Sequence, residues 1–327
     1  MSTSAPADAR SANATEAGAR SSCPVCASTR VRRFMIAPDN GHLRSQAVRL
    51  PVDRCADCDL FFLNPPPPAD IGREYFAETY AAETAANPYY TDEFKDRVGE
   101  VRAKLLNQYG LSSGRLLDVG CGKGHFVRSA KKAGWDAWGV ELDEGACDYA
   151  RTHLGLETVF AGSFDHSMLP AVFDAVTLWD VIEHVHDPLD CLRGAASKLR
   201  ESGWLVVRTG NIRSWTFDRN RRKWWAFGSD HRFYFSPASL TRALELSGFN
   251  VVSVLNQEKA ERPDKKRSVG LTDTSLSDGL RAIGRSPLKV ARLGSYLSGR
   301  FRRLAGQRKY GEHYGTSIMT IVAQKKT

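Results

Sequence analysis

The sequence predicts an α/β fold, in which a seven-stranded doubly wound sheet follows a small cysteine-rich module. Two observations predict the sheet. Strand-like and helix-like segments alternate from residue 111 to residue 327, and a glycine-rich turn joins the first of these strands to the first helix. A third observation, two Cys-x-x-Cys pairs between residues 22 and 64, predicts the module.

Seven segments are predicted to form the strands of the sheet. They are Arg115–Val119, Asp136–Glu141, Glu157–Phe160, Phe173–Leu178, Trp204–Thr209, Asn250–Val254 and Ser317–Ala323. Helices are predicted near residues 92–109, 124–133, 143–152, 187–200 and 236–247. The last helix should begin at Ser236-Pro237, a cap followed by a proline suited to the first turn, and end at Gly248.

Composition divides the chain into regions. Residues 1–21 are predicted to be a disordered tail, residues 22–64 a zinc-binding module, and residues 65–110 a linker with a leading helix. Residues 111–327 form the large α/β domain, with a basic insertion at 256–316 before the last strand. The linker opens with four consecutive prolines, which favour a stiff extended exit from the module.

Bulk composition is that of an ordinary globular protein, with 42% hydrophobic and 25% charged residues. No apolar run approaches the roughly 18 residues of a membrane span, and the tail lacks the apolar core of a secretory signal. Seven cysteines do not form the pattern of a secreted disulfide framework. We therefore expect a reducing, cytoplasmic setting.

Positive charge is concentrated in the insertion, where Arg281–Lys309 holds nine Lys/Arg residues and no acid. A helix starting at Ser286-Pro287 would place an apolar stripe opposite a basic face. Such a helix can lie on an anionic membrane, giving peripheral contact, or clamp a phosphorylated substrate. Docking onto its own domain is the alternative.

The strongest local signal is the run Leu116–Gly124, in which an apolar strand ends near Asp118 and a Gly-x-Gly-x-Gly turn opens a helix. Glycines let the backbone approach a ligand, and a helix N-terminus offers unpaired N–H groups to a carboxylate. Dinucleotide folds favour Gly-x-Gly-x-x-Gly without this acid. The spacing therefore favours another ligand, with Asp118 placed to pair with its cationic group.

The next predicted strand ends at Glu141, followed by Leu142. An acid at the tip of the second strand lies across the switch point of a doubly wound sheet, where it can accept hydrogen bonds from ribose hydroxyls. Leu142 offers an apolar wall for a purine. Both residues are therefore predicted to bind a ligand that contains a nucleoside.

Four segments in this order resemble class I S-adenosylmethionine-dependent methyltransferases. Within these, the resemblance is to the group that contains the ubiquinone-biosynthesis O-methyltransferase and many glycan and natural-product methyltransferases. The segments are Asp118–Gly124, Gly139–Asp143, Phe173–Pro188 and His231–Phe249. The resemblance implies a Rossmann-like methyltransferase sheet and S-adenosylmethionine (SAM) as the cofactor.

The resemblance also implies which residues bind SAM. They are Asp118, Gly120, Gly122, Gly124, Glu141, Leu142, Asp165 and Trp179. The glycines would cradle the methionine part near Asp118, and Glu141 would hold the ribose diol. Asp165 falls where the family places its adenine-contacting loop, although the common Gly-Asp pair is missing. Trp179 and Asp180 follow the fourth strand and would line the methyl-transfer site.

His231, His184 and Asp180 are the catalytic candidates. Methyl transfer from a sulfonium needs mainly alignment, but a hydroxyl acceptor also needs a base, and histidine has a near-neutral pKa. His231 is favoured because it follows a tryptophan-rich loop, whereas a structural role at a helix start weighs equally for His184. An acceptor platform and simple lid packing are both open for Trp215, Trp224 and Trp225.

Two Cys-x-x-Cys knuckles, Cys23/Cys26 and Cys55/Cys58, have the spacing of a tetrahedral thiolate site for structural Zn²⁺. A module of about 40 residues buries little core, so a metal is a plausible source of its stability. The module resembles the zinc ribbon that precedes some sugar and natural-product methyltransferases, although Ala27 and Asp59 stand where glycine is common. Redox-active or unpaired cysteine pairs are the alternative.

The sequence is compatible with three functions. A methyltransferase with a small-molecule, glycan or lipid-linked acceptor is the leading prediction. A nucleic-acid methyltransferase is weakened because Trp179-Asp180-Val181-Ile182 replaces the Asn/Asp-Pro-Pro-aromatic motif of amino-directed enzymes. A non-catalytic cofactor-binding scaffold is the third, and the intact glycine turn argues against it. The acceptor, the methylated atom and the oligomeric state are not predicted.

Overall fold

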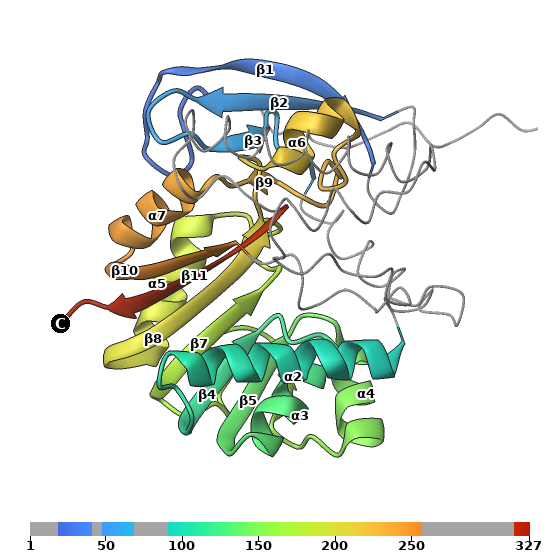
Figure 1. Ribbon diagram of the computed structural model, residues 1–327, viewed down its shortest axis with the longest axis vertical. Coiled ribbons are helices and arrows are strands. Elements are labelled where there is room, and N and C mark those ends of the chain that lie inside the picture. Colours follow the sequence, from blue (N-terminus) through green and yellow to red (C-terminus); the bar gives the residue numbers. More distant parts are fainter. Residues whose placement is uncertain (1–18, 41–47, 69–90, 257–316) are drawn as a thin grey trace, which may run out of the picture.

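The structure is a computed structural model that describes residues 19–40, 48–68, 91–256 and 317–327. Residues 1–18 of the predicted tail, residues 69–90 of the predicted linker and residues 257–316 of the predicted basic insertion lie outside these ranges. A small sheet lies at one end of the long axis, and a large sheet flanked by helices makes up the rest (Figure 1).

The large sheet is the one that the sequence predicts. Its strands are β4 (Gly114–Val119), β5 (Trp135–Glu141), β6 (Val159–Ala161), β7 (Phe173–Trp179), β8 (Leu199–Gly210), β10 (Phe249–Asn256) and β11 (Ile318–Lys325). Their order is β10-β11-β8-β7-β4-β5-β6. Strands β6, β5, β4, β7 and β8 pair in parallel, whereas β11 is antiparallel to both neighbours. The seven expected strands are confirmed, but β8 begins five residues before the predicted Trp204 and includes residues 199 and 200, which were predicted to end a helix.

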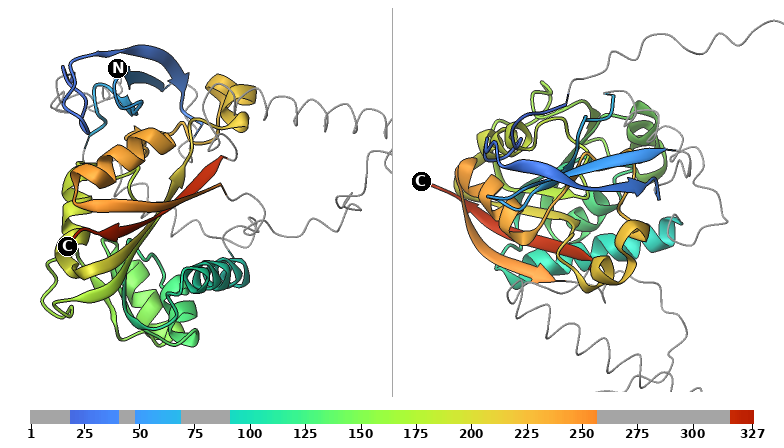
Figure 2. Two further views of the ribbon diagram at one scale, coloured as in Figure 1. Left: turned by 60° about the vertical axis from the view of Figure 1, so that its left-hand side comes forward. Right: turned by 90° about the horizontal axis from the view of Figure 1, so that it is seen from above.

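Helices cover both faces of this sheet (Figures 1 and 2). Helices α2 (Asp92–Gln108), α3 (His125–Lys132) and α4 (Glu144–Leu154) share one core, and α5 (Pro188–Lys198) and α7 (Pro237–Leu246) share the other. Alternation of side chains along each strand feeds both cores, since Leu116 packs toward the first and Leu117 toward the second. The sheet is therefore doubly wound.

The helix starts follow local capping rules. Helix α7 begins with a reciprocal pair of hydrogen bonds between Ser236 and Ser239, with Pro237 in the first turn, and Gly248 beyond its end has φ 86°. Helix α5 is capped by Asp187, whose carboxylate accepts from two backbone N–H groups. The predicted start and end of α7 are thus confirmed.

The small sheet contains β1 (Val31–Pro38), β2 (Arg49–Cys55), β3 (Phe61–Leu63) and β9 (Phe233–Tyr234), in that order and antiparallel throughout. Strand β9 comes from the large domain, and pairs Phe61 with Tyr234 and Phe62 with Phe233. The predicted module at 22–64 therefore shares a sheet with residues far along the chain. Helix α6 (Trp215–Asn220) and the 3₁₀ turn η1 (Arg221–Lys223) lie beside it.

One face of the small sheet forms a third core with residues from the segment around α6 and β9. Trp224 is wholly buried in it, among Phe217, Phe227 and Tyr234, whereas the neighbouring Trp225 is 48% exposed. Trp224 is thus a packing residue, and Trp225 remains available to a ligand.

Replacing Trp224 by alanine should lower the free energy of unfolding by about 3–5 kcal/mol, because it removes a buried aromatic side chain and leaves a cavity. Trp225→Ala, at the next position, should change it by no more than about 0.5 kcal/mol. Denaturant unfolding of the two variants checks this contrast, and equal stability losses would contradict the burial assignment.

Candidate methyl-transfer site

The glycine turn between β4 and α3 lies at the switch point of the sheet, where β4 has β5 on one side and β7 on the other. Gly120, Gly122 and Gly124 have φ of 68°, 53° and 81°, in the left-handed region that favours glycine. A Cβ on Gly120 would lie 2.6 Å from Cγ2 of Val181. The turn thus brings bare backbone close to the segment that follows β7.

Glu141 closes this turn from the tip of β5. Its carboxylate accepts hydrogen bonds from the N–H groups of Gly122 (2.8 Å), Leu142 (2.7 Å) and Asp143 (3.2 Å). Burial raises the pKa of Glu141 above its ordinary value, and these three donors oppose that rise. Leu142 is 70% exposed beside it, which leaves an apolar side chain without cover next to a buried acid.

Asp118 lies buried beneath the glycine turn. Thr177 on β7 donates a 2.7 Å hydrogen bond to it, and burial raises the pKa of Asp118 to about 7. The charge of Arg102 on α2 opposes this rise. Asp118 therefore sits in an apolar setting where a cationic group would stabilise its charged form.

Asp180 follows β7 at φ 60° and is paired with two arginines. Arg102 Nη2 lies 3.1 Å from its carboxylate, and Arg208 on β8 contacts the same oxygen. Burial alone would raise the pKa of Asp180, but the two guanidinium charges lower it. Arg102 also lies over the ring of Trp179, 4.8 Å from the ring centroid. Asp180 is thus a fixed carboxylate in a charged cluster.

His184 and His231 meet edge to face, with ring centroids 4.6 Å apart. His184 Nδ1 lies 3.0 Å from the carbonyl oxygen of Asp230, and His231 Nδ1 lies 2.7 Å from that of Ala226. A carbonyl oxygen can only accept, so each Nδ1 carries the proton and each Nε2 is left as the basic nitrogen. The structure brings the two candidate bases together.

The two histidines differ in their electrostatic surroundings. Burial lowers the pKa of His184 to about 4, so this ring is neutral at neutral pH. Burial would also lower the pKa of His231, but the charges of Asp230 and Glu183 outweigh it and raise this pKa. Asp230 Oδ2 lies 3.6 Å from Nε2 of His231. His231 is therefore the stronger base of the pair.

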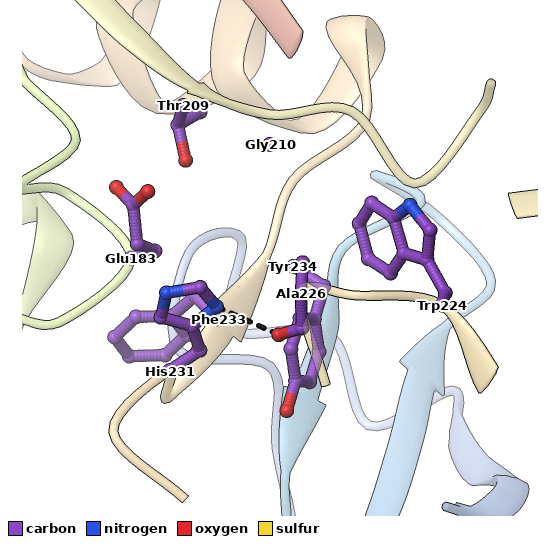
Figure 3. A pocket seen from close by; sticks show the side chains of 8 residues that line it. All are labelled: Glu183, Thr209, Gly210, Trp224, Ala226, His231, Phe233 and Tyr234. Atoms are coloured by element: carbon purple, nitrogen blue, oxygen red, sulfur yellow. Dashed lines mark hydrogen bonds between the residues drawn. The ribbon is translucent and has the colours of Figure 1, made fainter. Parts of the chain in front are cut away.

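A small pocket opens beside His231 (Figure 3), and it is lined by Glu183 and Thr209, whose side chains are hydrogen-bonded to each other. Glu183 is buried, burial raises its pKa to about 7, and one of its carboxylate oxygens has no hydrogen-bond partner among the described residues. Ligand atoms of Glu183, His184 and His231 lie within 4.8 Å of one another, close enough to share a cation.

The four predicted metal ligands meet in the small domain. The Sγ atoms of Cys23, Cys26, Cys55 and Cys58 all lie within 4.8 Å of one another, and those of Cys23 and Cys58 are 3.5 Å apart. Four thiolates around Zn²⁺ stand about 3.8 Å apart, so the cluster fits that ion. The hydrogen bond between Cys23 and Cys58 lowers the pKa of Cys23 to about 5 and raises that of Cys58, so the two sulfur atoms share one proton.

Some site residues stand apart or were not foreseen. Asp165 lies exposed in the turn after β6. Arg102, Arg208, Glu183 and Asp230 contribute charge to the site but were not predicted. Arg208 had a signal, since it is a lone charge inside an apolar strand, and Glu183 and Asp230 each precede a candidate histidine. No sequence signal pointed to Arg102, because only the fold brings helix α2 close to Trp179.

Known proteins similar to this chain include ubiquinone biosynthesis O-methyltransferases. The mitochondrial enzyme of Schizosaccharomyces pombe is 33% identical over 30% of this chain and 38% of its own length. That of Aliivibrio fischeri (strain MJ11) is 34% identical over 35% of this chain and 52% of its own length. The enzyme of Aeromonas salmonicida is 29% identical over 50% of this chain and 71% of its own length. The chain thus spans 38% of the length of the first of these relatives and 52% of the length of the second.

Solved structures similar to this one are also methyltransferases by name. A SAM-dependent methyltransferase of Thermotoga maritima, described as a possible histamine N-methyltransferase, aligns with a TM-score of 0.47 at 20% identity, over 79% of this chain and 100% of its own. Magnesium protoporphyrin IX methyltransferase of Synechocystis, solved with bound SAH, aligns with a TM-score of 0.47 at 16% identity, over 60% and 95%.

Among the described residues, no helix combines the length and the apolar character that a membrane span requires. The family described as "Methyltransferase domain" matches residues 90–254, half of the chain, and so covers β4 to β8, the glycine turn, Glu141 and both histidines. The chain therefore belongs to this family, the class I SAM-dependent methyltransferases.

Proposed function

We propose that the protein is an enzyme that transfers a methyl group from SAM to a small-molecule acceptor. One observation carries the proposal. At the switch point, the turn with three left-handed glycines is joined through the N–H of Gly122 to the buried carboxylate of Glu141, beside the exposed Leu142. These features match the parts of SAM. The bare backbone suits the methionine part, the buried carboxylate can accept from the ribose diol, and the exposed leucine can cover the purine.

The cofactor residues divide the ligand between them. Gly120, Gly122 and Gly124 leave room for the methionine part, and Asp118 is the partner for its ammonium. Glu141 accepts hydrogen bonds from the ribose diol with the lone pairs that the backbone N–H groups leave open, and Leu142 covers the purine. Trp179 lines the methyl-transfer site, and Asp165 completes the adenine side. When bound, SAM supplies an activated methyl group, so these residues need only hold it in line with the acceptor.

We propose a planar aromatic hydroxyl compound as the acceptor. The half-exposed ring of Trp225 offers a stacking surface, and its centroid is 6.4 Å from that of His231. The names of the similar ubiquinone biosynthesis O-methyltransferases agree with methylation at oxygen. A compound stacked on Trp225 would present its hydroxyl to the imidazole.

His231 is the proposed general base. Its Nδ1–H is held by the carbonyl oxygen of Ala226, which leaves Nε2 to accept the proton of the acceptor hydroxyl. The charges of Asp230 and Glu183 raise its pKa and so stabilise the imidazolium that forms. His184, whose pKa is about 4, orients the ring of His231 from its edge. Asp180 holds Arg102 and Arg208 in place around the methyl-transfer site.

We propose that Cys23, Cys26, Cys55 and Cys58 bind one structural Zn²⁺. Four thiolates complete a tetrahedral site and leave no open position for chemistry. The basic segment Arg281–Lys309 lies outside the described residues, so recruitment of a lipid-linked acceptor or contact with an anionic membrane is proposed from its sequence alone.

Glu141→Ala should weaken binding of S-adenosylhomocysteine by about 1.5–3 kcal/mol, because charge-assisted hydrogen bonds to the ribose are lost. Isothermal calorimetry measures this directly. Glu144→Ala is the matched control, since Glu144 is an exposed acid on α4 three residues away. Equal affinity in both variants would rule out Glu141 as the ribose ligand. If the wild-type protein does not bind S-adenosylhomocysteine, both the methyltransferase and the non-catalytic cofactor-binding scaffold are ruled out.

His231→Ala should lower turnover with a hydroxyl acceptor by about two to four powers of ten, because the proton then has no base to receive it. Affinity for S-adenosylhomocysteine should stay nearly unchanged. The acceptor itself comes from a screen with labelled SAM followed by mass analysis. His153→Ala, an exposed histidine on α4, is the control. A loss of cofactor affinity in His231→Ala would show a structural role instead.

Freshly purified protein should contain about one zinc ion per chain. Cys55→Ser should lose the metal, because a hydroxyl is a poor replacement for a thiolate ligand. Cys191→Ser should keep it, since Cys191 lies on α5, away from the cluster. Elemental analysis of the three proteins provides the measurement, and full metal content in Cys55→Ser would exclude the site.

A further inference from the structure

The second knuckle carries an aspartate in a backbone conformation that favours glycine. Asp59 follows Cys58 and has φ 64°, and Ala27, at the equivalent place after Cys26, has φ 58°. A side chain in this region is strained, and such strain is commonly kept where the side chain has a function. The two positions differ in what the side chain does, because Ala27 is exposed whereas Asp59 is in contact with the large domain.

The carboxylate of Asp59 forms a two-point ion pair with Arg213, in the loop between β8 and α6. Arg213 Nε donates to Oδ2 at 2.7 Å, and Nη2 donates to Oδ1. Arg54 on β2 donates to the same Oδ1 at 2.8 Å. Both guanidinium groups lie over the ring of Phe61, 5.1 and 5.5 Å from its centroid. A planar fork on a carboxylate fixes orientation as well as distance.

The backbone of Asp59 makes a second link to the large domain. Its carbonyl oxygen accepts a 3.1 Å hydrogen bond from Ser236 Oγ, which also caps α7. Arg213 and Ser236 flank the segment 214–235 on its two sides. This segment contains Trp225, Asp230 and His231. One residue of the cysteine module therefore holds both ends of the segment that carries the proposed base.

Strand pairing fixes the same segment between its ends. Strand β3 begins two residues after Asp59 and pairs with β9, which begins two residues after His231. The backbone N–H of Leu63 donates to the carbonyl oxygen of Arg232 at 3.0 Å, and the N–H groups of Arg232 and Phe233 donate to that of Glu183. The second knuckle is thus connected through β3 to the residues that follow His231, and through these to Glu183, which precedes His184.

We propose that Asp59 is a positioning residue for methyl transfer, through which the cysteine knuckle fixes the acceptor-side segment 214–235 and sets the place of His231. The cysteine module is then one wall of the catalytic centre and not a separable binding module. The role of His231 in this inference rests on the proposed function. The contacts of Asp59 are independent of that function.

Asp59→Gly is the most direct test. Glycine suits φ 64° and keeps the carbonyl oxygen, so the knuckle should retain its metal, while the ion pair to Arg213 is lost. Backbone amides in residues 224–235 should then exchange hydrogen at least about tenfold faster than in the wild type. The imidazole ¹H–¹⁵N NMR signals of His231 should also move. Zinc content and affinity for S-adenosylhomocysteine should change by less than about twofold.

Two further variants complete the experiment. Ala27→Gly relaxes the equivalent position of the first knuckle without touching the large domain, and should leave exchange and the His231 signals as in the wild type. Arg213→Gln removes the same ion pair from the other side and should reproduce the effect of Asp59→Gly.

The proposal is overturned if exchange in residues 224–235 and the His231 signals are the same in Asp59→Gly as in the wild type. It is also overturned if Asp59→Gly loses its zinc while Ala27→Gly keeps it, because Asp59 would then act inside the knuckle. Failure of the proposed function has a different signature. In that case wild-type protein does not bind S-adenosylhomocysteine, whereas the exchange result still reports whether Asp59 holds the segment.

Discussion

The hydrogen bond between the N–H of Gly122 and the carboxylate of Glu141 joins the tips of β4 and β5 where the strand order reverses. The proposed cofactor site depends on this contact. It requires left-handed glycines in the turn and a buried acid at the end of β5, and it keeps Leu142 on the surface. Burying a carboxylate is costly unless donors meet it, and three backbone N–H groups do so here.

The acceptor side is built on a different principle, since its parts come from distant segments. Arg102 from α2 and Arg208 from β8 meet on Asp180, and the ring of His184 contacts that of His231 beside a small pocket. Each buried charge has a partner or a shifted pKa, as the low polarity of the interior requires. The cysteine module shares two cores with this side, so its position and that of the histidines are coupled.

Much of this arrangement could be predicted from the sequence because it is local. The strand-like segments, the Ser236-Pro237 cap and the glycine turn each carry their signal within a few residues, and the structure has them where they were expected. Contacts between distant segments carry no such signal. Nothing in the sequence pairs Arg102 with Asp180, or β9 with β3, because only the folded chain brings them together. Trp224 and Trp225 show the same limit, since two identical neighbours have opposite burial.

SAM is proposed to bind at the switch point with Glu141 on its ribose. A crystal structure with S-adenosylhomocysteine tests this most directly. We expect both ribose hydroxyls to lie on the Glu141 carboxylate, with the amino acid part against Gly120–Gly124 and the purine against Leu142. A ligand held elsewhere, or one whose ribose faces away from Glu141, would contradict this binding mode.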